Sequence, residues 1–299
     1  MSAQNLRSQF PNSDILPELT GAFRISPVKG FDRGPSVFRF DPSGILKING
    51  AYHVYYTRFS PLDHWSDLFQ TPNQTQIWLA TSEDGWHWNE AGQVLEDSPP
   101  ESWHRAGKHA PHVIHVNDIF YLFYTAHVGP EYHNKRIGLA VSDTPTGPFR
   151  HTGDGPLMDA GPEVFDSVGQ DDSCVLQRDN KFWWYFKGYG TDPQTGLLIN
   201  NRLCLATADA PHGPYTRSDQ NPVTLTHTGC VWPHGSGLAM ISDAADTSRT
   251  HPYPPCIQYS QDGTDFVRGA AIRATTTDDH IRAGMDLSMK HWGNHLMDP

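Results

Sequence analysis

The sequence predicts an all-β protein, a five-bladed β-propeller with a short N-terminal helical arm. The first observation is a repeated unit of a polar residue, an apolar pair, a turn and an aromatic run. It starts at four regularly spaced positions, Asp41, His109, Asp171 and His234. The second is a marker that keeps step with the unit, in which a strand and a tight turn precede an aromatic residue. The third is composition, because 26 Gly, 24 Pro and 9 Trp without long Leu, Ala, Glu or Lys runs favour turns and strands.

Bulk composition limits the classes of partner. A chain of 299 residues with 37% hydrophobic content can bury a large core, and the repeats favour one propeller over two domains. The net charge of −11 argues against nucleic acid or an anionic membrane as partner, because such binding requires clustered positive charge. The four cysteines have no close pair, so we expect reduced, buried thiols. The chain starts without an apolar signal-peptide core and contains no run of membrane-spanning length, so we expect a cytoplasmic protein.

Residues 1–34 form the predicted N-terminal arm, and residues 35–299 form the predicted catalytic propeller. The arm contains one short expected helix, Ser2 to Phe10, and an apolar stretch from Ile15 to Leu19. A segment of this composition buries too little apolar surface to fold alone. We therefore expect it to pack on the propeller or on a second copy of the chain.

The first three blades carry long insertions after their second strands. Blade one has expected strands at 44–48, 52–57, 77–82 and 93–95, blade two runs from 109 to about 158, and blade three from 171 to about 225. In a radial array these insertions gather on one face, where their aromatic residues either cover the core or wall a ligand site. The insertions carry His64, Trp65 and Phe69 in blade one and His127, Glu131, Tyr132 and His133 in blade two.

The fourth blade is expected from 231 to about 270. The remaining N- and C-terminal strands are expected to pair and close a fifth blade, which removes exposed sheet edges. The count of five rests on chain length, and three clear copies with one degenerate copy leave four or six open.

The first residues of the repeats are the candidates for chemistry, because the first strand of a propeller blade lines the central channel. We expect Asp41, His109, Asp171 and His234 to form a ring around one funnel. Carboxylates and imidazoles among Trp and Tyr side chains are typical of a glycosidase. One carboxylate activates water or attacks the sugar, and another group protonates the leaving oxygen.

Structural interpretations stay open for several of these residues. Asp41 precedes Pro-Ser and is suited to capping a turn, and one carboxylate of the Asp171-Asp172 pair is expected to cap while the other faces the site. His109 and His112 are either core histidines or, with His115, a metal group, which their odd spacing on a strand disfavours. The repeated turn residues are assigned to structure; they are Asp84, Asp143, Asp209 and Asp262.

Five sets of residues follow one another in a specific order and spacing. They are Phe40-Asp-Pro-Ser-Gly-Ile-Leu-Lys47 with Tyr52-His-Val-Tyr-Tyr-Thr57, Leu79-Ala-Thr-Ser-Glu-Asp-Gly-Trp-His-Trp88, Tyr121-Leu-Phe-Tyr-Thr-Ala126, Phe165-Asp-Ser-Val-Gly-Gln-Asp-Asp-Ser-Cys174 and His227-Thr-Gly-Cys-Val-Trp-Pro-His-Gly-Ser-Gly237. In these motifs, from about Arg39 to Phe266, the chain resembles glycoside hydrolase family 117. That family consists of five-bladed propellers that act on neoagaro-oligosaccharides and release 3,6-anhydro-L-galactose.

The resemblance implies roles for three residues. Asp41 is similar to the family's general base, Asp171 to the second acidic residue that tunes the site, and His227 to the family's histidine general acid. A histidine can donate a proton at neutral pH if a carboxylate holds it protonated. The family places a Glu directly after this histidine, whereas this chain has Thr228. Either another acid supports His227, or the substrate and the rate differ; His234 is the second candidate acid.

The resemblance also implies a binding site and an assembly. The expected substrate-binding residues are His109, Gln170, Asp172, His234, Trp65 and Trp232. No residue is assigned as a metal ligand and no cofactor is assigned, although some relatives bind divalent metal ions and the His-rich funnel leaves room for one. The family exchanges its N-terminal helical arm between two subunits, which implies a homodimer.

The sequence therefore predicts an exo-acting, inverting glycoside hydrolase that releases a terminal α-linked sugar, 3,6-anhydro-L-galactose or a related one, from an oligosaccharide. A non-catalytic glycan-binding propeller is the first alternative, which the missing Glu after His227 favours. An arabinanase- or xylosidase-like propeller, with a glutamate acid near Glu163, is the second. A metal-dependent lyase or hydrolase that uses His109 is the third.

Overall fold

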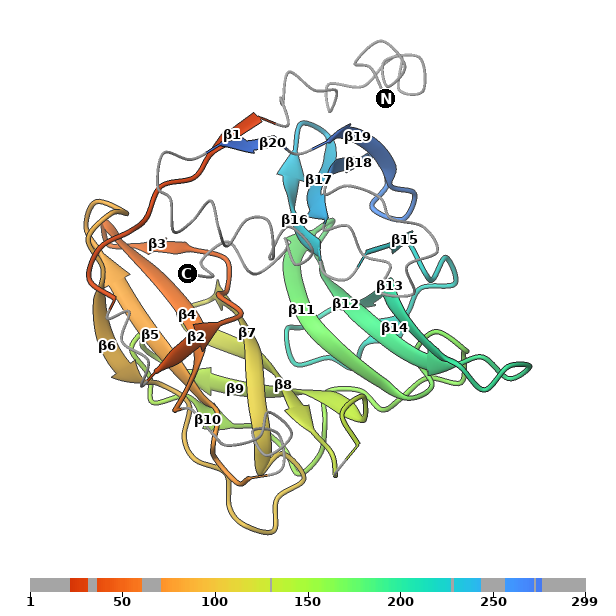
Figure 1. The fold of residues 1–299 in the computed structure, drawn as a ribbon, viewed down its shortest axis with the longest axis horizontal. Helices are drawn as coiled ribbons and strands as arrows, with labels where there is room; N and C mark the ends of the chain where they lie inside the picture. Colours follow the sequence, from red (N-terminus) through yellow and green to blue (C-terminus); the bar gives the residue numbers. More distant parts are fainter. Residues whose placement is uncertain are drawn as a thin grey trace.

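The structure is a computed structural model that describes residues 22–31, 37–60, 71–129, 131–226, 229–242, 256–271 and 273–275. These residues form strands and turns and no helix (Figure 1), which confirms the all-β prediction. In this part of the chain, nothing helical has the length and apolar character required to cross a membrane. The helix expected at Ser2 to Phe10 lies outside the described residues, and residues 22–31 of the predicted arm begin with a strand.

The strands form four antiparallel blades in chain order. Blade 1 contains β2 (Phe38–Phe40), β3 (Leu46–Ile48), β4 (Ala51–Phe59), β5 (Gln76–Ser82) and β6 (Asn89–Gln93). Blade 2 contains β7 (Ala106–Val116), β8 (Ile119–His127), β9 (Lys135–Ser142) and β10 (Arg150–His151). Blade 3 contains β11 (Gly169–Arg178), β12 (Lys181–Thr191), β13 (Leu198–Ala208), β14 (Thr216–Arg217) and β15 (Thr224–Leu225). Blade 4 contains β16 (Gly229–His234), β17 (Gly237–Ser242), β18 (Cys256–Ser260) and β19 (Val267–Ala271).

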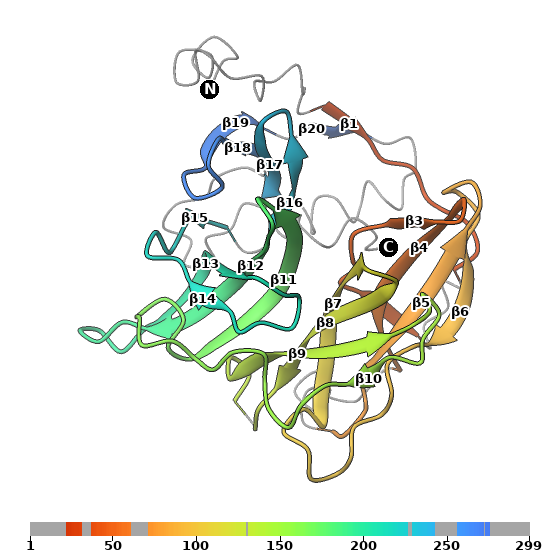
Figure 2. The ribbon, with the colours of Figure 1, turned by 180° about the vertical axis from the view of Figure 1, so that it is seen from behind.

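The prediction of five blades is wrong for the described residues, which form four. The N- and C-terminal strands do pair, as β1 (Ala22–Arg24) and β20 (Arg273–Thr275), but in parallel and as a two-stranded sheet. In both views this pair lies at the periphery between blade 4 and blade 1 (Figures 1 and 2). The terminal strands therefore bridge the two ends of the blade array without completing a further blade among the described residues.

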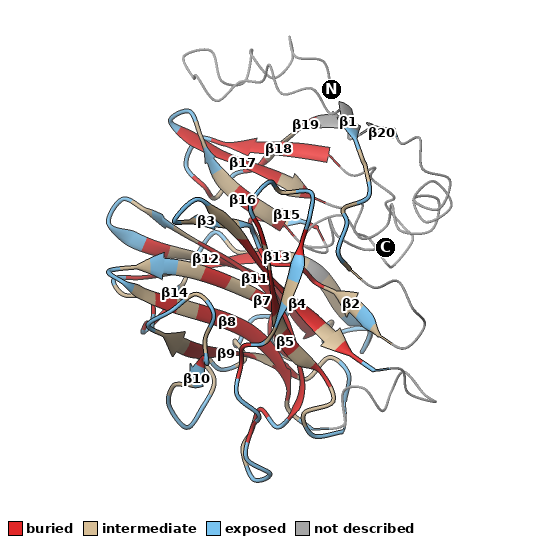
Figure 3. Cartoon of the chain, turned by 90° about the vertical axis from the view of Figure 1, so that its left-hand side faces the viewer, coloured by how far each residue is buried: buried red, intermediate tan, exposed pale blue. Residues whose placement is uncertain are grey.

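The apolar core lies between neighbouring blades. Successive residues of a strand point to opposite faces of its sheet, so the second strand of each blade serves two interfaces. Leu122 and Tyr124 of β8 pack toward blade 1, and Phe123 packs toward blade 3. In β12, Trp184 packs toward blade 2 and Tyr185 toward blade 4. The buried residues run along these strands through the centre of the molecule (Figure 3).

Two tyrosine hydroxyl groups connect neighbouring blades at equivalent positions. Tyr55 of β4 donates a hydrogen bond to the Pro145 carbonyl in blade 2, at 2.7 Å. Tyr185 of β12 donates to the Gly263 carbonyl in blade 4, at 2.8 Å. Both acceptors lie in the tight turns that the repeated marker predicted, so these turns also join blades.

The hairpins between the first and second strands have two-residue turns. Asn49-Gly50, Asn117-Asp118 and Asp179-Asn180 all have positive φ at both residues, the conformation that fits the twist of a two-residue hairpin. The four cysteines are free, as expected.

Candidate active site

The inner strands of blades 1 to 3 each kink at one non-glycine residue in the left-handed backbone region. These residues are Asp41, Ala110 and Asp172, with φ between 47° and 51°. In blade 1 the kink separates β2 from β3, and in blades 2 and 3 the pairing register of β7 and β11 shifts at this point. Non-glycine residues rarely adopt this conformation, and such strain often marks functional sites.

The pairing registers correct our alignment of the repeats by one residue. Phe40 pairs with Thr57, His109 with Thr125, and Asp171 with Lys187. Asp41 is therefore equivalent to Ala110 and Asp172, one position later than His109 and Asp171. Blade 1 has one extra residue between this point and its hairpin, which the ungapped alignment concealed.

Asp171 lies at the centre of a group of interacting charged side chains that we call the central cluster, made of Asp41, His109, Lys135, Asp171, Asp172 and Lys187. Lys135 Nζ lies 2.7 Å from Asp171 Oδ2, and the Tyr189 hydroxyl donates to the same oxygen at 3.0 Å. Burial by itself would raise the pKa of Asp171. The charges of Lys135 and Lys187, together with the adjacent His109, outweigh burial and hold that pKa well below its usual value. Asp171 is therefore a carboxylate at neutral pH.

Lys187 joins Asp171 to its neighbour in sequence. Its Nζ atom lies 3.2 Å from Asp171 Oδ2 and 2.5 Å from Asp172 Oδ2. Burial opposes the charge on Lys187, but the two carboxylates raise its pKa well above the usual value. Lys187 and Lys135 thus place two positive charges beside the carboxylates of blade 3.

His109 is held in one tautomer when it is neutral. Its Nδ1 atom lies 2.9 Å from the Gly107 carbonyl oxygen, which only accepts hydrogen bonds, so Nδ1 carries the hydrogen. Its Nε2 atom faces Asp171 Oδ1 at 3.4 Å and Lys135 Nζ at 3.5 Å. The ring of His127 lies 5.2 Å away, and burial, with the charges of His109 and Lys135, lowers the pKa of His127. His127 is therefore neutral at physiological pH.

Asp41 joins this cluster from blade 1. Its pKa is raised to about 8, first by burial and then by the charge of Asp172, while His109 acts in the opposite direction. Asp171 raises this pKa and Lys187 lowers it. Groups whose charges act on one another in this way occupy one site, so the structure brings Asp41, His109, Asp171 and Asp172 together.

An exposed aromatic residue connects the buried cluster to the surface. Tyr132, in the blade 2 insertion, is 46% exposed, and Lys135 Nζ lies 4.3 Å from the centre of its ring. Its ring also lies 5.6 Å from His127 and 4.9 Å from His133. His133 in turn contacts Tyr189, at 4.9 Å between ring centres. The cluster therefore lies one side chain beneath an aromatic surface.

Three of the expected site residues do not join the cluster. Gln170 is buried and donates to the Asp159 carbonyl at 2.8 Å, in the segment that precedes β11. His234 is the last residue of β16 and pairs with Gly237 in a hairpin, so it lies at the opposite end of the inner strand from the position of Asp171. The fourth copy of the repeat was aligned wrongly, because its inner strand begins at Gly229. Trp232 is half-buried on β16 and pairs with Ala239.

Two expected residues lie outside the described part of the chain. They are His227, the candidate general acid, and Trp65 in the blade 1 insertion. Their assigned roles stay predictions.

Lys135 and Lys187 are the members of the cluster that sequence reasoning missed. Both are almost fully buried. A signal was present, because Lys187 stands in the aromatic strand Phe182-Trp-Trp-Tyr-Phe-Lys-Gly-Tyr189, and lysine is almost never fully buried unless it is paired.

The described residues contain no group of three or more His, Cys, Asp or Glu side chains arranged to hold a metal ion. In the central cluster, ammonium groups already lie against the carboxylates of Asp171 and Asp172. These residues as described do not fit a divalent cation.

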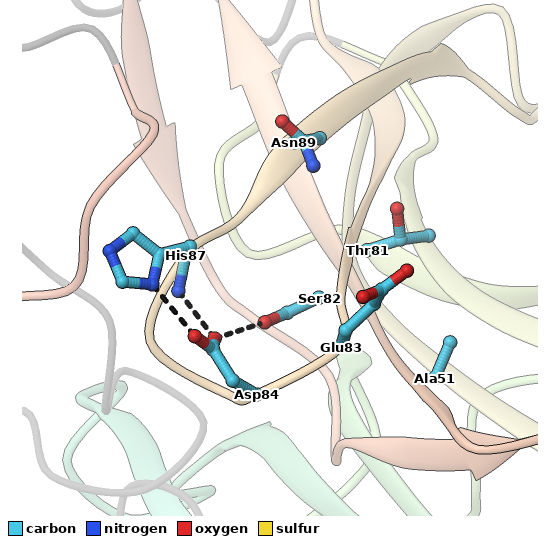
Figure 4. Close-up of a pocket in the computed structure, with 7 residues that line it drawn as sticks. All are labelled: Ala51, Thr81, Ser82, Glu83, Asp84, His87 and Asn89. Atoms are coloured by element: carbon cyan, nitrogen blue, oxygen red, sulfur yellow. Dashed lines mark hydrogen bonds and ion pairs between the residues drawn. The ribbon is translucent and has the colours of Figure 1, made fainter.

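A separate surface pocket of about 340 Å³ lies at the turn between β5 and β6 (Figure 4). Asp84 accepts hydrogen bonds there from Ser82, from His87 and from the backbone of the turn. Asp262 makes the equivalent bonds with Ser260 and its own turn in blade 4. The shared geometry confirms that Asp84 and Asp262 stabilise turns.

Comparisons with known proteins agree with this fold. The family model described as glycosyl hydrolases family 43 matches residues 36–172. The structure of Zg3597, a family 117 glycoside hydrolase produced by the marine bacterium Zobellia galactanivorans, is 25% identical, with a TM-score of 0.71, over 84% of this chain and 74% of that chain. No curated protein matches the chain.

Two further solved structures share the fold at lower identity. One, described simply as a glycoside hydrolase, is 14% identical, with a TM-score of 0.66, over 91% of this chain and 83% of that one. The other, a GH43_1 enzyme from Xanthomonas citri complexed with xylotriose, is 18% identical, with a TM-score of 0.55, over 78% and 74%. The fold and the comparisons define the protein as a β-propeller glycoside hydrolase. Within that class, its resemblance to glycoside hydrolase family 117, indicated by the sequence motifs, is confirmed by the solved family 117 structure.

Proposed function

We propose that the chain is an exo-acting, inverting glycoside hydrolase that removes a terminal α-linked sugar, 3,6-anhydro-L-galactose or a related one, from an oligosaccharide. The observation that carries the proposal is the convergence of Asp41, His109 and Asp171 from three blades on one buried site. The choice of sugar rests on the resemblance of the sequence motifs to glycoside hydrolase family 117.

In the proposed reaction Asp41 takes a proton from water while the water oxygen bonds to the anomeric carbon. The glycosidic carbon–oxygen bond breaks, and the leaving oxygen receives a proton from His227. Asp171, held ionised by Lys135, sets the charge of the site. Separate groups for water activation and leaving-group protonation are the arrangement of inverting enzymes.

The test is hydrolysis of neoagaro-oligosaccharides, with product identification and NMR observation of the first anomer formed. Release of one terminal sugar per cleavage with inverted configuration is the expected result. Internal cleavage would contradict the exo assignment, and a retained configuration would contradict the inverting one. An Asp41→Asn variant measured in parallel controls for contaminating activity.

The proposed base role for Asp41 predicts an ascending pH profile. A base acts in its ionised form, and burial raises the pKa of Asp41 to about 8 in the free enzyme. The ratio kcat/KM is therefore expected to rise with pH through this region, because it reports ionisations of the free enzyme. A profile that is flat through this region would contradict the base role of Asp41.

An arabinanase- or xylosidase-like activity is a second candidate, favoured by the family 43 match over residues 36–172. Arabino- and xylo-oligosaccharides belong in the same substrate panel. Sugar binding without product release from any substrate would instead favour the glycan-binding alternative.

The N-terminal arm of residues 1–34 is proposed to join two subunits in a homodimer. Light scattering of the full chain and of a chain without residues 1–21 tests this proposal. If both chains form particles with the same number of subunits, the arm is not required for the assembly.

A further inference from the structure

Lys187 breaks a pattern that blades 1 and 2 keep. The equivalent positions in blades 1 and 2 are Thr57 and Thr125, which are fully buried. Thr57 Oγ1 accepts the amide of Ala110 at 3.1 Å, and Thr125 Oγ1 accepts the amide of Asp172 at 3.3 Å. A threonine at this position thus supports the kinked residue of the next blade. Blade 3 has a lysine instead.

The lysine is directed to its own blade. Its ammonium group contacts both Asp171 and Asp172, and it lies 5.2 Å from the centre of the Tyr189 ring. Only 2% of Lys187 is exposed. Burying an ammonium group costs free energy unless it is paired with an opposite charge. Lysine in place of threonine at this position therefore indicates a role that offsets this cost.

Charge balance indicates that purpose. The central cluster contains three carboxyl groups and two lysines, and carboxylates that share a site do not all ionise without compensating charge. The two lysines contact the carboxylates of blade 3, with Lys135 at 2.7 Å from Asp171 and Lys187 at 2.5 Å from Asp172. The cluster also contains His109 of β7. Among the described residues, the titratable side chains that face the cluster include His127 of β8, Tyr132 and His133 of the blade 2 insertion and Tyr189 of β12.

We propose that Lys187 is a positioning residue that holds the side chains of Asp171 and Asp172 and keeps Asp171 ionised, so that Asp41 is the carboxyl group of the cluster that exchanges a proton during turnover. This inference rests on the proposed glycosidase function of the same site. It assigns Asp171 of blade 3 to a fixed negative charge and the proton transfer to blade 1.

The test compares Lys187→Thr with Lys187→Arg. Lys187→Thr introduces the residue that blades 1 and 2 carry at this position, so its side chain suits the backbone there. Lys187→Arg keeps the charge. Because Lys187 lowers the pKa of Asp41, its loss is expected to move the ascending limb of kcat/KM to higher pH. Lys187→Arg is expected to keep the limb near its original position.

A purely structural lysine would give a different result. In that case Lys187→Thr would lower activity by the same factor, or Tm by the same amount, at every pH. The ascending limb of kcat/KM would stay at its original pH. That result, or a limb that moves equally in Lys187→Arg, would overturn the inference.

A titration without substrate separates this inference from the proposed function. With ¹³C-labelled aspartate in the wild-type chain, NMR is expected to show one cluster carboxyl titrating across the neutral range, and its signal is expected to vanish in Asp41→Asn. Two or more titrating cluster carboxyls would overturn the inference, even if Lys187→Thr did not fold. The expected titration in a protein that cleaves no sugar would support the assigned ionisation of the cluster and refute the proposed function.

Discussion

Asp41 combines backbone strain, burial and a displaced pKa in a single residue. Its φ of 49° is in the left-handed region, and only 5% of the residue is exposed. Each of these features costs folding free energy, so their coincidence indicates a functional role. Asparagine tolerates the left-handed region as well as aspartate does, which makes Asp41→Asn a conservative probe.

We predict that Asp41→Asn lowers kcat by about 10²–10⁴-fold, the usual contribution of a general base. Oligosaccharide binding, measured by calorimetry, is expected to persist, because the amide keeps the shape of the carboxyl group. Asp84→Asn, in the exposed turn of blade 1, is the control and is expected to keep full turnover. Near-normal turnover in Asp41→Asn would remove Asp41 from the mechanism.

Tyr132 is predicted to stack on the sugar. It is the exposed aromatic side chain that covers Lys135, and an aromatic face of this kind suits a sugar ring. Tyr132→Ala is expected to raise KM by about 2–10-fold, the equivalent of one aromatic contact, with a smaller effect on kcat. Tyr132→Phe should retain most of the affinity, and Trp86→Ala, which removes an exposed aromatic from a remote turn, should have no effect. An unchanged KM in Tyr132→Ala would place the sugar elsewhere.

At the scale of elements, the blades are joined by specific hydrogen bonds as well as by apolar packing. Tyr185 connects β12 to the turn of blade 4 through Gly263, and its ring packs at 6.0 Å and a steep angle on Phe266. Tyr259 of β18 is also fully buried, but its hydroxyl has no hydrogen-bond partner among the described residues. These two tyrosines form a matched pair for measuring one such hydrogen bond.

Tyr185→Phe is expected to reduce the free energy of unfolding by about 1 kcal/mol, since it leaves the Gly263 carbonyl without its donor. Tyr259→Phe is expected to be neutral or stabilising, because it removes a buried hydroxyl that makes no bond to the described residues. Urea unfolding of both variants checks the difference, with unchanged glycosidase activity as a control. Equal losses in the two variants would contradict the role assigned to the inter-blade bond.

The sequence was sufficient to predict strands but not their exact register. The apolar alternation and turn signals located β3, β4 and β5 within a few residues, because each strand's pattern is local. Blade 1 has a single extra residue after Asp41, so Asp41 is equivalent to Asp172 and not to Asp171. An ungapped comparison does not detect this extra residue. His234 was misplaced for a related reason, since its Gly-Ser-Gly neighbours imitate the start of a repeat while forming a hairpin. Long-range pairing, which short motifs do not encode, decided both cases.

At the scale of the whole molecule, the site exists only when three blades are packed. Asp41 comes from blade 1, His109 and Lys135 from blade 2, and Asp171 and Lys187 from blade 3. The motifs predicted that Asp41, His109 and Asp171 converge, because all lie at inner strands of a propeller. Lys135 and Lys187 were not predicted, since they lie on second and third strands and meet the carboxylates only through tertiary packing.

Because the cluster forms only in the folded state, its ionisations link stability to pH. Asp41 has an ordinary carboxyl pKa when unfolded and a pKa of about 8 when folded. Between these values the folded state holds a proton that the unfolded state has released, so rising pH favours unfolding. This contribution to stability is fully present below the unfolded pKa and is lost as pH rises toward about 8. Asp171 has the opposite sign, because its pKa is lowered on folding and its contribution is lost as pH falls.

We therefore predict that Asp41→Asn increases Tm in a pH-dependent way. Near pH 4 the protonated acid and the amide are both neutral, so the two proteins should unfold at similar temperatures. As pH rises toward about 8, the unfolded wild-type chain gains stability by ionising Asp41, while the folded chain keeps that residue protonated. The variant has no such group, so its free energy of unfolding does not fall for this reason. The difference in Tm is expected to reach on the order of 5 °C, which corresponds to a few kcal/mol for a chain of this size. Differential scanning calorimetry across this range measures the difference in Tm. A difference that is constant with pH would show that Asp41 has an ordinary carboxyl pKa in the folded protein.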